Sequence, residues 1–159
     1  MNFFHSQLLL SALLCFLAGS LSYLNTLQCG IVYDDEPAIK KNQDLRPHTP
    51  WTNILHHDFW GAEMTSASSH KSYRPLCVST YRLNYLLHEL EPMGYHVVNV
   101  FLHGCVCFLY VFLCGLVCGV MWPTLLAGIM FSLHPIHTEA VSEATYRADV
   151  KMREVECDE

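Results

Sequence analysis

Apolar residues fall into three blocks along the chain instead of recurring at the spacing of a soluble core. The first block, residues 3–27, carries no charged side chain, and the second, residues 95–122, is polar only near its beginning. Each exceeds the roughly 20 residues that a transmembrane helix needs. The third block, residues 123–133, is too short to span a bilayer as an independent helix. The pattern therefore predicts a tight helical hairpin that turns around residues 119–123.

These blocks divide the chain into four predicted segments. Residues 1–27 form a first transmembrane helix or signal anchor, 28–94 a long loop, 95–133 the helical hairpin, and 134–159 a polar segment with a charged tail. If three helices cross the membrane, the long loop and the final segment lie on the same side. A cleavable signal peptide within the first block remains the alternative to an uncleaved helix.

The composition agrees with a membrane protein. Of 159 residues, 52% are hydrophobic and only 15% are charged, which is apolar for a soluble domain. The formal net charge of -6 argues against a nucleic-acid partner, which requires clustered Lys and Arg. The predicted fold class is an all-α membrane protein with two to three transmembrane helices and short amphipathic helices beside the membrane.

The long loop carries three helix-start signals, each with a proline at the first helical position. They predict helices over residues 37–44, over residues 51–59, and from 75 to about 90. The third is amphipathic, because its leucines recur at helical spacing: Leu76, Leu83, Leu87 and Leu90. We expect it to lie along the bilayer, with Arg82 elsewhere on its surface. Residues 61–72 are rich in small polar side chains and predict a mobile loop.

An acidic cluster follows the first apolar block. Asp34, Asp35 and Glu36 are adjacent in the sequence, and like charges at this separation repel one another. Such a cluster occurs either as a freely solvated loop or as a working site. Both interpretations are open from the local sequence alone.

A second polar cluster, His134, His137 and Glu139, follows the third block. Three hypotheses apply to it. Two imidazoles and a carboxylate are zinc ligands, although their spacing differs from the HExxH zinc motif. Alternatively, His134 caps a helix and Glu139 compensates its dipole. Third, the cluster forms a polar pocket at the mouth of the helices, where ionisable residues are functional candidates.

Several motifs occur in order between residues 30 and 150. They are Val-Tyr-Asp-Asp-Glu-Pro-Ala-Ile at 32–39, Trp51, Ser-Tyr-Arg-Pro-Leu at 72–76, Tyr-Arg-Leu-Asn-Tyr at 81–85, Tyr95-His96, Asn99, Leu102-His103 and His-Pro-Ile-His-Thr-Glu-Ala-Val at 134–141. Together they resemble the transmembrane and tetratricopeptide-repeat containing family. Members of that family are O-mannosyltransferases of the endoplasmic-reticulum membrane with the GT-C architecture. The resemblance implies a partial GT-C fold, a multi-pass protein and a lumenal loop over residues 28–94.

The resemblance also implies a reaction. Mannose moves from dolichyl-phosphate mannose to Ser or Thr of secretory-pathway proteins, with cadherins as known clients, in one inverting displacement. Asp35 is the implied base, with Asp34 and Glu36 as alternates. Arg74, or else Arg82, is the implied ligand of the lipid phosphate, unless these side chains extend to lipid headgroups. The second polar cluster would shape the same pocket, and no metal or cofactor besides the donor is expected.

Family members continue through further transmembrane helices into tetratricopeptide repeats, whereas residues 151–159 here are charged and cannot span a membrane. We therefore expect a truncated form. One hypothesis is an enzyme fragment that bears the catalytic loop. The other is a catalytically inactive membrane protein that only associates with relatives or partners. Exposure of the polar residues His96, Asn99 and His103 to lipid would favour the second hypothesis, because unpaired polar groups there are costly.

Overall fold

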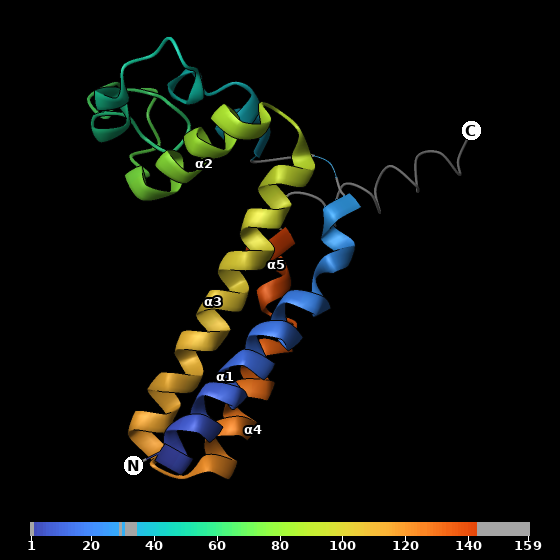
Figure 1. Ribbon diagram of the computed structural model, residues 1–159. Helices are drawn as coiled ribbons and strands as arrows, with labels where there is room; N and C mark the ends of the chain where they lie inside the picture. The colour runs from blue at the N-terminus through green and yellow to red at the C-terminus, as the bar shows by residue number, and fades with distance from the viewer. Residues whose placement is uncertain (1, 29, 31–34, 143–159) are drawn as a thin grey trace, which may run out of the picture. The chain divides into compact units, whose positions relative to one another are not determined.

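The structure, a computed structural model, describes residues 2–28, 30 and 35–142 (Figure 1). The described residues form helices and turns, with an isolated β-bridge between His57 and Glu63. They separate into two compact units: a helical unit, from residues 2–28 and 96–142, and a loop unit, from residue 30 and residues 35–95.

The helical unit contains the apolar helices. Its elements are α1 (Asn2–Ser22), η1 (Leu24–Gln28), α3 (Pro92–Cys118) from residue 96 onward, α4 (Met121–Ser132) and α5 (His137–Ser142). Figure 1 shows α1, α3 and α4 running alongside one another. Phe4–Gln28 and Pro92–Cys118 are long and apolar enough to cross a membrane, and α4 is a shorter apolar helix. The predicted class, an all-α membrane protein, is confirmed.

Small residues allow these helices to pack closely. A Cβ atom added to Gly128 of α4 would lie 2.6 Å from Val111 of α3 and 2.8 Å from the thiol of Cys15 on α1. A Cβ atom on Gly19 of α1 would lie 2.8 Å from the thiol of Cys107 on α3. Helices in membranes associate through close packing of such small residues, because the surrounding lipid is as apolar as leucine.

The hairpin differs slightly from its predicted bounds. Helix α3 begins at Pro92, three residues before the predicted block, and ends at Cys118. Gly119 has a φ of 62°, a conformation that glycine adopts without steric cost. Helix α4 begins at Met121, so the turn is only two residues long and Trp122 lies in α4.

The polar residues of α3, whose exposure would have favoured the association hypothesis, are buried or half-buried. His96 is 4% exposed and His103 is 8% exposed, while Asn99 is half-buried. The ring of His103 packs edge-on against Tyr23 with centroids 5.0 Å apart, and its Nε2 lies 3.5 Å from the thiol of Cys107. The two histidines therefore lack the exposure that would have favoured the association hypothesis, and His103 is covered by Tyr23, by Gly19 of α1 and by His137 of α5.

The loop unit replaces the first two predicted helices with short turns. Its elements are η2 (Glu36–Lys40), η3 (Gln43–Leu45), η4 (Trp51–Leu55) and α2 (Pro75–His88). The predicted helix over 37–44 is interrupted at Asn42, which has extended backbone and whose side chain accepts a hydrogen bond from the Asp44 amide. An Asn side chain competes in this way with the helical hydrogen bond. Helix α2 appears where the sequence predicted it and ends before Glu89, which has a φ of 53°.

A small apolar core holds the loop unit together. Its buried members come from all four elements, the turn before α2 and the start of α3: Ala38, Ile39, Leu45, Ile54, Phe59, Val78 and Tyr95. Arg82 is also buried, at 2% exposed. Its guanidinium donates to the carbonyl oxygens of Asp44, at 2.9 Å, and Thr49, and it lies 4.3 Å from the ring centroid of Trp51. The expected surface position of Arg82 was wrong, because these carbonyl groups compensate its burial.

Residues 61–72 form an ordered loop around Asp58 and not the mobile loop that their composition predicted. Asp58 is 1% exposed, and its carboxylate accepts hydrogen bonds from the Ser69 hydroxyl at 2.6 Å and the His70 amide at 3.1 Å. The amides of Trp60 and Ala62 donate to its other oxygen. Burial acts to raise the pKa of Asp58, but these four hydrogen bonds outweigh it and lower the pKa below its usual value.

Candidate functional site

The acidic motif lies at the start of the loop unit. Asp35 is half-buried, has helical backbone (φ −72°, ψ −22°) and directly precedes η2, but its side chain does not cap that turn. Glu36 is exposed and lies 3.9 Å from the Lys41 ammonium. Asp34 lies outside the described residues. Of the two described carboxylates, Asp35 is therefore the more enclosed.

Arg74 occupies the residue before α2. It is exposed, and its Cζ lies 5.0 Å from the ring centroid of Phe59. Since the aromatic face holds the guanidinium by a cation–π contact, the side chain is positioned without using its hydrogen-bond donors. Arg82, by contrast, directs donors to backbone carbonyl groups of its own unit. The geometry thus gives Arg82 a structural position and leaves Arg74 accessible to an anion.

The electrostatic environment of Tyr81 includes two charged residues that are far apart in the sequence, Asp35 and Arg74. The pKa of the Tyr81 phenol is raised, first by burial and then by the Cys77 thiol and the Asp35 carboxylate, while the Arg74 guanidinium acts in the opposite direction. Charges act this way over short distances. Arg74 and Tyr81 both pack against the ring of Phe59, with distances of 5.0 Å from Cζ of Arg74 to the ring centroid and 6.0 Å between the two ring centroids.

The second polar cluster belongs to the helical unit. His134 is exposed, and its Nδ1 accepts a hydrogen bond from the Ile136 amide at 3.1 Å. The ring of His137 lies 5.1 Å from that of His103 and 4.5 Å from that of Phe131. Among the described residues, no group of three or more His, Cys, Asp or Glu side chains is arranged to hold a metal ion.

Glu139 lies within α5. His134 thus stabilises the turn that precedes this helix, which resembles the structural hypothesis for the cluster, and His137 packs among aromatic rings.

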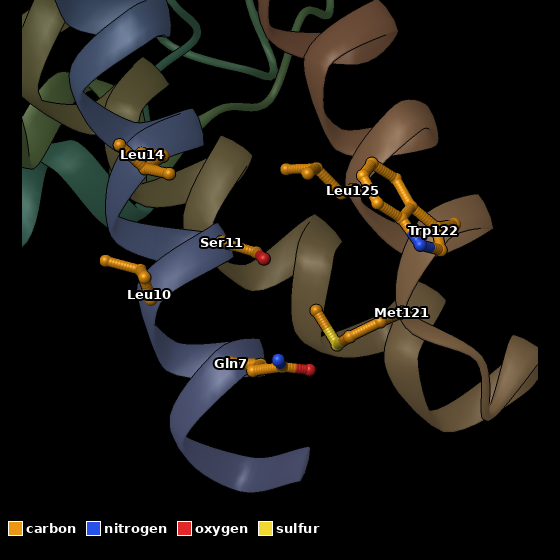
Figure 2. A pocket seen from close by; sticks show the side chains of 7 residues that line it. All are labelled: Gln7, Leu10, Ser11, Leu14, Met121, Trp122 and Leu125. Atoms are coloured by element: carbon orange, nitrogen blue, oxygen red, sulfur yellow. The ribbon is translucent and has the colours of Figure 1, made fainter. Parts of the chain in front are cut away.

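One cavity of about 270 Å³ opens between α1 and α4 in the helical unit (Figure 2). Its lining is mostly apolar: Gln7, Leu10, Ser11, Leu14, Met121, Trp122 and Leu125. Figure 2 shows Gln7 and Ser11 on the α1 side facing Met121 and Leu125 on α4. None of these lining side chains is an acid or a base, and no base lies among them to activate the Ser11 hydroxyl. We therefore interpret the cavity as a groove between packed helices and not as a candidate site for glycosyl transfer.

Sequence reasoning missed two features of the loop unit. The first is Tyr81, which the motif included without a role. Tyr81 lies four residues after Cys77 and seven after Arg74, a spacing that indicates one shared face and that was available in the sequence. The second is the contact between His57 and Asp44, whose Nδ1 and Oδ2 atoms are 2.7 Å apart. That pair depends on a turn that no local pattern marks.

Comparisons with known proteins point to one family. Protein O-mannosyl-transferase tmtc2 of Xenopus laevis is 54% identical over 145 residues, which cover 91% of this chain and 17% of that protein. Protein O-mannosyl-transferase TMTC2 of Homo sapiens is 52% identical, covering 83% of this chain and 16% of that protein. Protein O-mannosyl-transferase TMTC3 of Homo sapiens is 47% identical, covering 80% of this chain and 14% of that protein. No protein-family model matches the chain, and no solved structure matches it.

These relatives define the class: the chain aligns with glycosyltransferases named as protein O-mannosyl-transferases. The family is the transmembrane and tetratricopeptide-repeat containing one, and the resemblance that the motifs indicated is confirmed. The chain spans only 14–17% of the length of these three relatives.

Proposed function

We propose that this chain provides the acidic loop of a protein O-mannosyltransferase of the endoplasmic-reticulum membrane. Its donor is dolichyl-phosphate mannose, and its acceptors are Ser or Thr hydroxyls of secretory-pathway proteins such as cadherins. Two observations support the proposal: Asp35 is a partly enclosed carboxylate directly before η2, and Arg74, held against the Phe59 ring before α2, is an exposed guanidinium of the same loop unit.

Asp35 takes the proton of the acceptor hydroxyl in this proposal. The acceptor oxygen forms a bond to C1 of mannose, and the bond from C1 to the phosphate oxygen breaks with inversion. The electron pair departs on the phosphate, which needs no acid but gains from a nearby cation. Partial burial favours Asp35 over the exposed Glu36.

Arg74 binds the lipid phosphate in this proposal. A guanidinium matches phosphate oxygens with two parallel donors, and the Arg74 side chain is exposed. Arg82 is a poor alternative, because moving it to a phosphate would leave the carbonyl groups of Asp44 and Thr49 without their donor.

The exposed face of α2 supports a position at the membrane surface. Its leucines are exposed, with Leu76 at 83%, Leu87 at 77% and Leu83 at 54%. An apolar helix face in this state is stabilised by lying in the interface between headgroups and acyl chains. That position brings Arg74, at the start of α2, to the depth at which a lipid phosphate lies.

The test uses a chimera in which this chain replaces the aligned stretch of the Xenopus laevis relative. Mannose transfer to a cadherin-domain acceptor is measured in cells lacking the endogenous enzymes. We expect Asp35→Asn to reduce transfer at least 100-fold and Arg74→Gln to reduce it about tenfold at limiting donor. Lys40→Gln, which removes an exposed charge from η2, serves as the matched control.

Normal transfer by the Asp35→Asn chimera would refute Asp35 as the base and direct attention to Asp34 or Glu36. Loss of transfer in every chimera, including the unsubstituted one, would refute the assignment of the loop. The chain expressed alone is measured beside the chimera. Transfer by the chain alone would show that the remaining parts of the relatives are not required for catalysis.

A further inference from the structure

The cavity between α1 and α4 contains polar groups that the helices leave unused. Its α1 side includes Gln7 and Ser11, which are one helical turn apart. Ser11 is 6% exposed, and Figure 2 shows its hydroxyl directed into the space between α1 and α4. Within the described part of the chain, neither the Ser11 hydroxyl nor the Gln7 amide has a hydrogen-bond partner. A buried polar group in this state is costly until a partner reaches it.

Other hydroxyl groups in this unit bond to their own helix. The Ser22 hydroxyl donates to the Ala18 carbonyl oxygen at 2.7 Å, and the Thr124 hydroxyl donates to that of Val120 at 2.8 Å. Ser and Thr in helices often bond in this way to the carbonyl group four residues earlier. Ser11 does not, so its O–H remains available to a group inside the cavity.

The lining favours a narrow, flexible occupant over another helix. Where helices of this unit pack against one another, a Cβ atom added to a glycine would lie 2.4–2.8 Å from the neighbouring helix, as it would at Gly19, Gly104, Gly115 and Gly128. Such small residues let helix backbones approach closely in a membrane. The cavity is lined by large apolar side chains and by no glycine or alanine. A helix backbone would be held away from it, whereas a single hydrocarbon chain is thin enough to enter.

The cavity runs from one membrane interface into the hydrocarbon region. Gln7 lies near the start of α1, and Trp122 lies near the start of α4. Tryptophan is enriched at the depth of the lipid headgroups. Leu14 is seven residues beyond Gln7 and therefore about 10 Å deeper, at 1.5 Å per residue. The polar groups thus lie toward the outer end of an apolar groove, as the ester carbonyl groups of a glycerophospholipid lie above its acyl chains.

We propose that this groove binds one acyl chain of a glycerophospholipid, with the Ser11 hydroxyl and the Gln7 amide donating to an ester carbonyl oxygen. No lining side chain is charged, so the site selects the ester and the chain and not the charge of the headgroup. The groove belongs to the helical unit, whereas Asp35 and Arg74 belong to the loop unit. Its test therefore involves no mannose transfer and is independent of the proposed function.

The test labels the intact chain in detergent micelles with phosphatidylcholine that carries a photoreactive acyl chain, and unlabelled lipids compete. We expect saturable labelling of the residues that line the groove. Diacyl phosphatidylcholine and diacyl phosphatidylserine should compete within about twofold of each other, because no basic side chain attracts the anionic headgroup. Diether phosphatidylcholine has no ester carbonyl group and should compete about tenfold more weakly, the effect of losing up to two neutral hydrogen bonds.

Two pairs of variants locate the site. Ser11→Ala should weaken lipid binding about fivefold by removing one hydrogen bond, whereas Ser22→Ala, which loses only a bond within its own helix, should leave binding unchanged. Leu14→Trp should weaken binding about tenfold by overfilling the groove. Leu13→Trp is the matched control, because Leu13 is exposed and does not line the groove.

Three results would overturn the proposal. The first is labelling that does not saturate, or that Leu13→Trp and Leu14→Trp reduce equally. The second is equal competition by the diacyl and diether lipids, a comparison that uses the unsubstituted chain and does not depend on the folding of any variant. The third is crosslinking between two chains by benzoylphenylalanine in place of Leu14, which would assign the groove to a second copy of this chain.

Discussion

Replacing Arg82 with alanine should open the loop unit while leaving the helical unit folded. The guanidinium donates to two backbone carbonyl groups and packs over the Trp51 ring. A hydrogen bond from a charged donor contributes about 1.5–3 kcal/mol, and a cation–π contact adds about 0.5–2 kcal/mol. Part of this sum offsets the cost of burying the charged guanidinium. Burial lowers the pKa of Arg82, and the nearby Asp44 carboxylate partly opposes that effect by raising the pKa. The net loss should be about 4 kcal/mol, because two carbonyl groups lose their donor and a large buried side chain leaves a cavity.

Hydrogen exchange measures this loss directly, because it reports the opening of one region of a folded protein. The amides of Arg46 and Thr49 bond to the carbonyl groups of Gln43 and Arg46, beside the carbonyl groups that Arg82 binds. In detergent micelles their protection should fall by about three decades, since 1.36 kcal/mol corresponds to a factor of ten. Arg74→Ala, at the residue before the same helix, is the control and should change protection by less than threefold. Protection within tenfold of the parent in Arg82→Ala would refute the structural role of the guanidinium.

The remaining predictions concern the other contacts described above. Asp58→Asn should destabilise residues 61–72 by about 2 kcal/mol at neutral pH. In the parent, the stability that the Asp58 carboxylate contributes is complete above the usual Asp pKa of 3.8 and is lost as the pH falls through the lowered pKa of Asp58. Hydrogen exchange at the His70 amide measures both effects. Gly128→Ala should cost about 1–3 kcal/mol through its clash with Val111, measured as a lower thermal midpoint in micelles, with the exposed Leu126→Ala as control. Brominated lipid should quench the added tryptophan fluorescence of a Leu87→Trp variant at least about twice as strongly as that of a Glu63→Trp variant, each measured relative to the parent. Equal quenching of the two variants would refute the position of α2 at the membrane surface.

Local sequence patterns predicted those parts of the protein that depend on local physics. The length and apolar content of residues 3–27 and 95–122 predicted two spanning helices, because a bilayer imposes a minimum length and excludes charge. Glycine at 119 and proline at 75 marked a turn and a helix start through their own backbone preferences. The ordered motifs carried the family resemblance without any knowledge of the fold.

Tertiary structure decided what each polar side chain does. Arg82 and Arg74 are the same residue type within one amphipathic segment, yet the turns that contain Asp44 and Thr49 supply carbonyl groups to the first and nothing comparable to the second. Residues 61–72 have the composition of a mobile loop, and a single carboxylate at Asp58 orders them through four hydrogen bonds. Burial and hydrogen-bond partners come from segments distant in sequence, and only the folded chain brings those segments together.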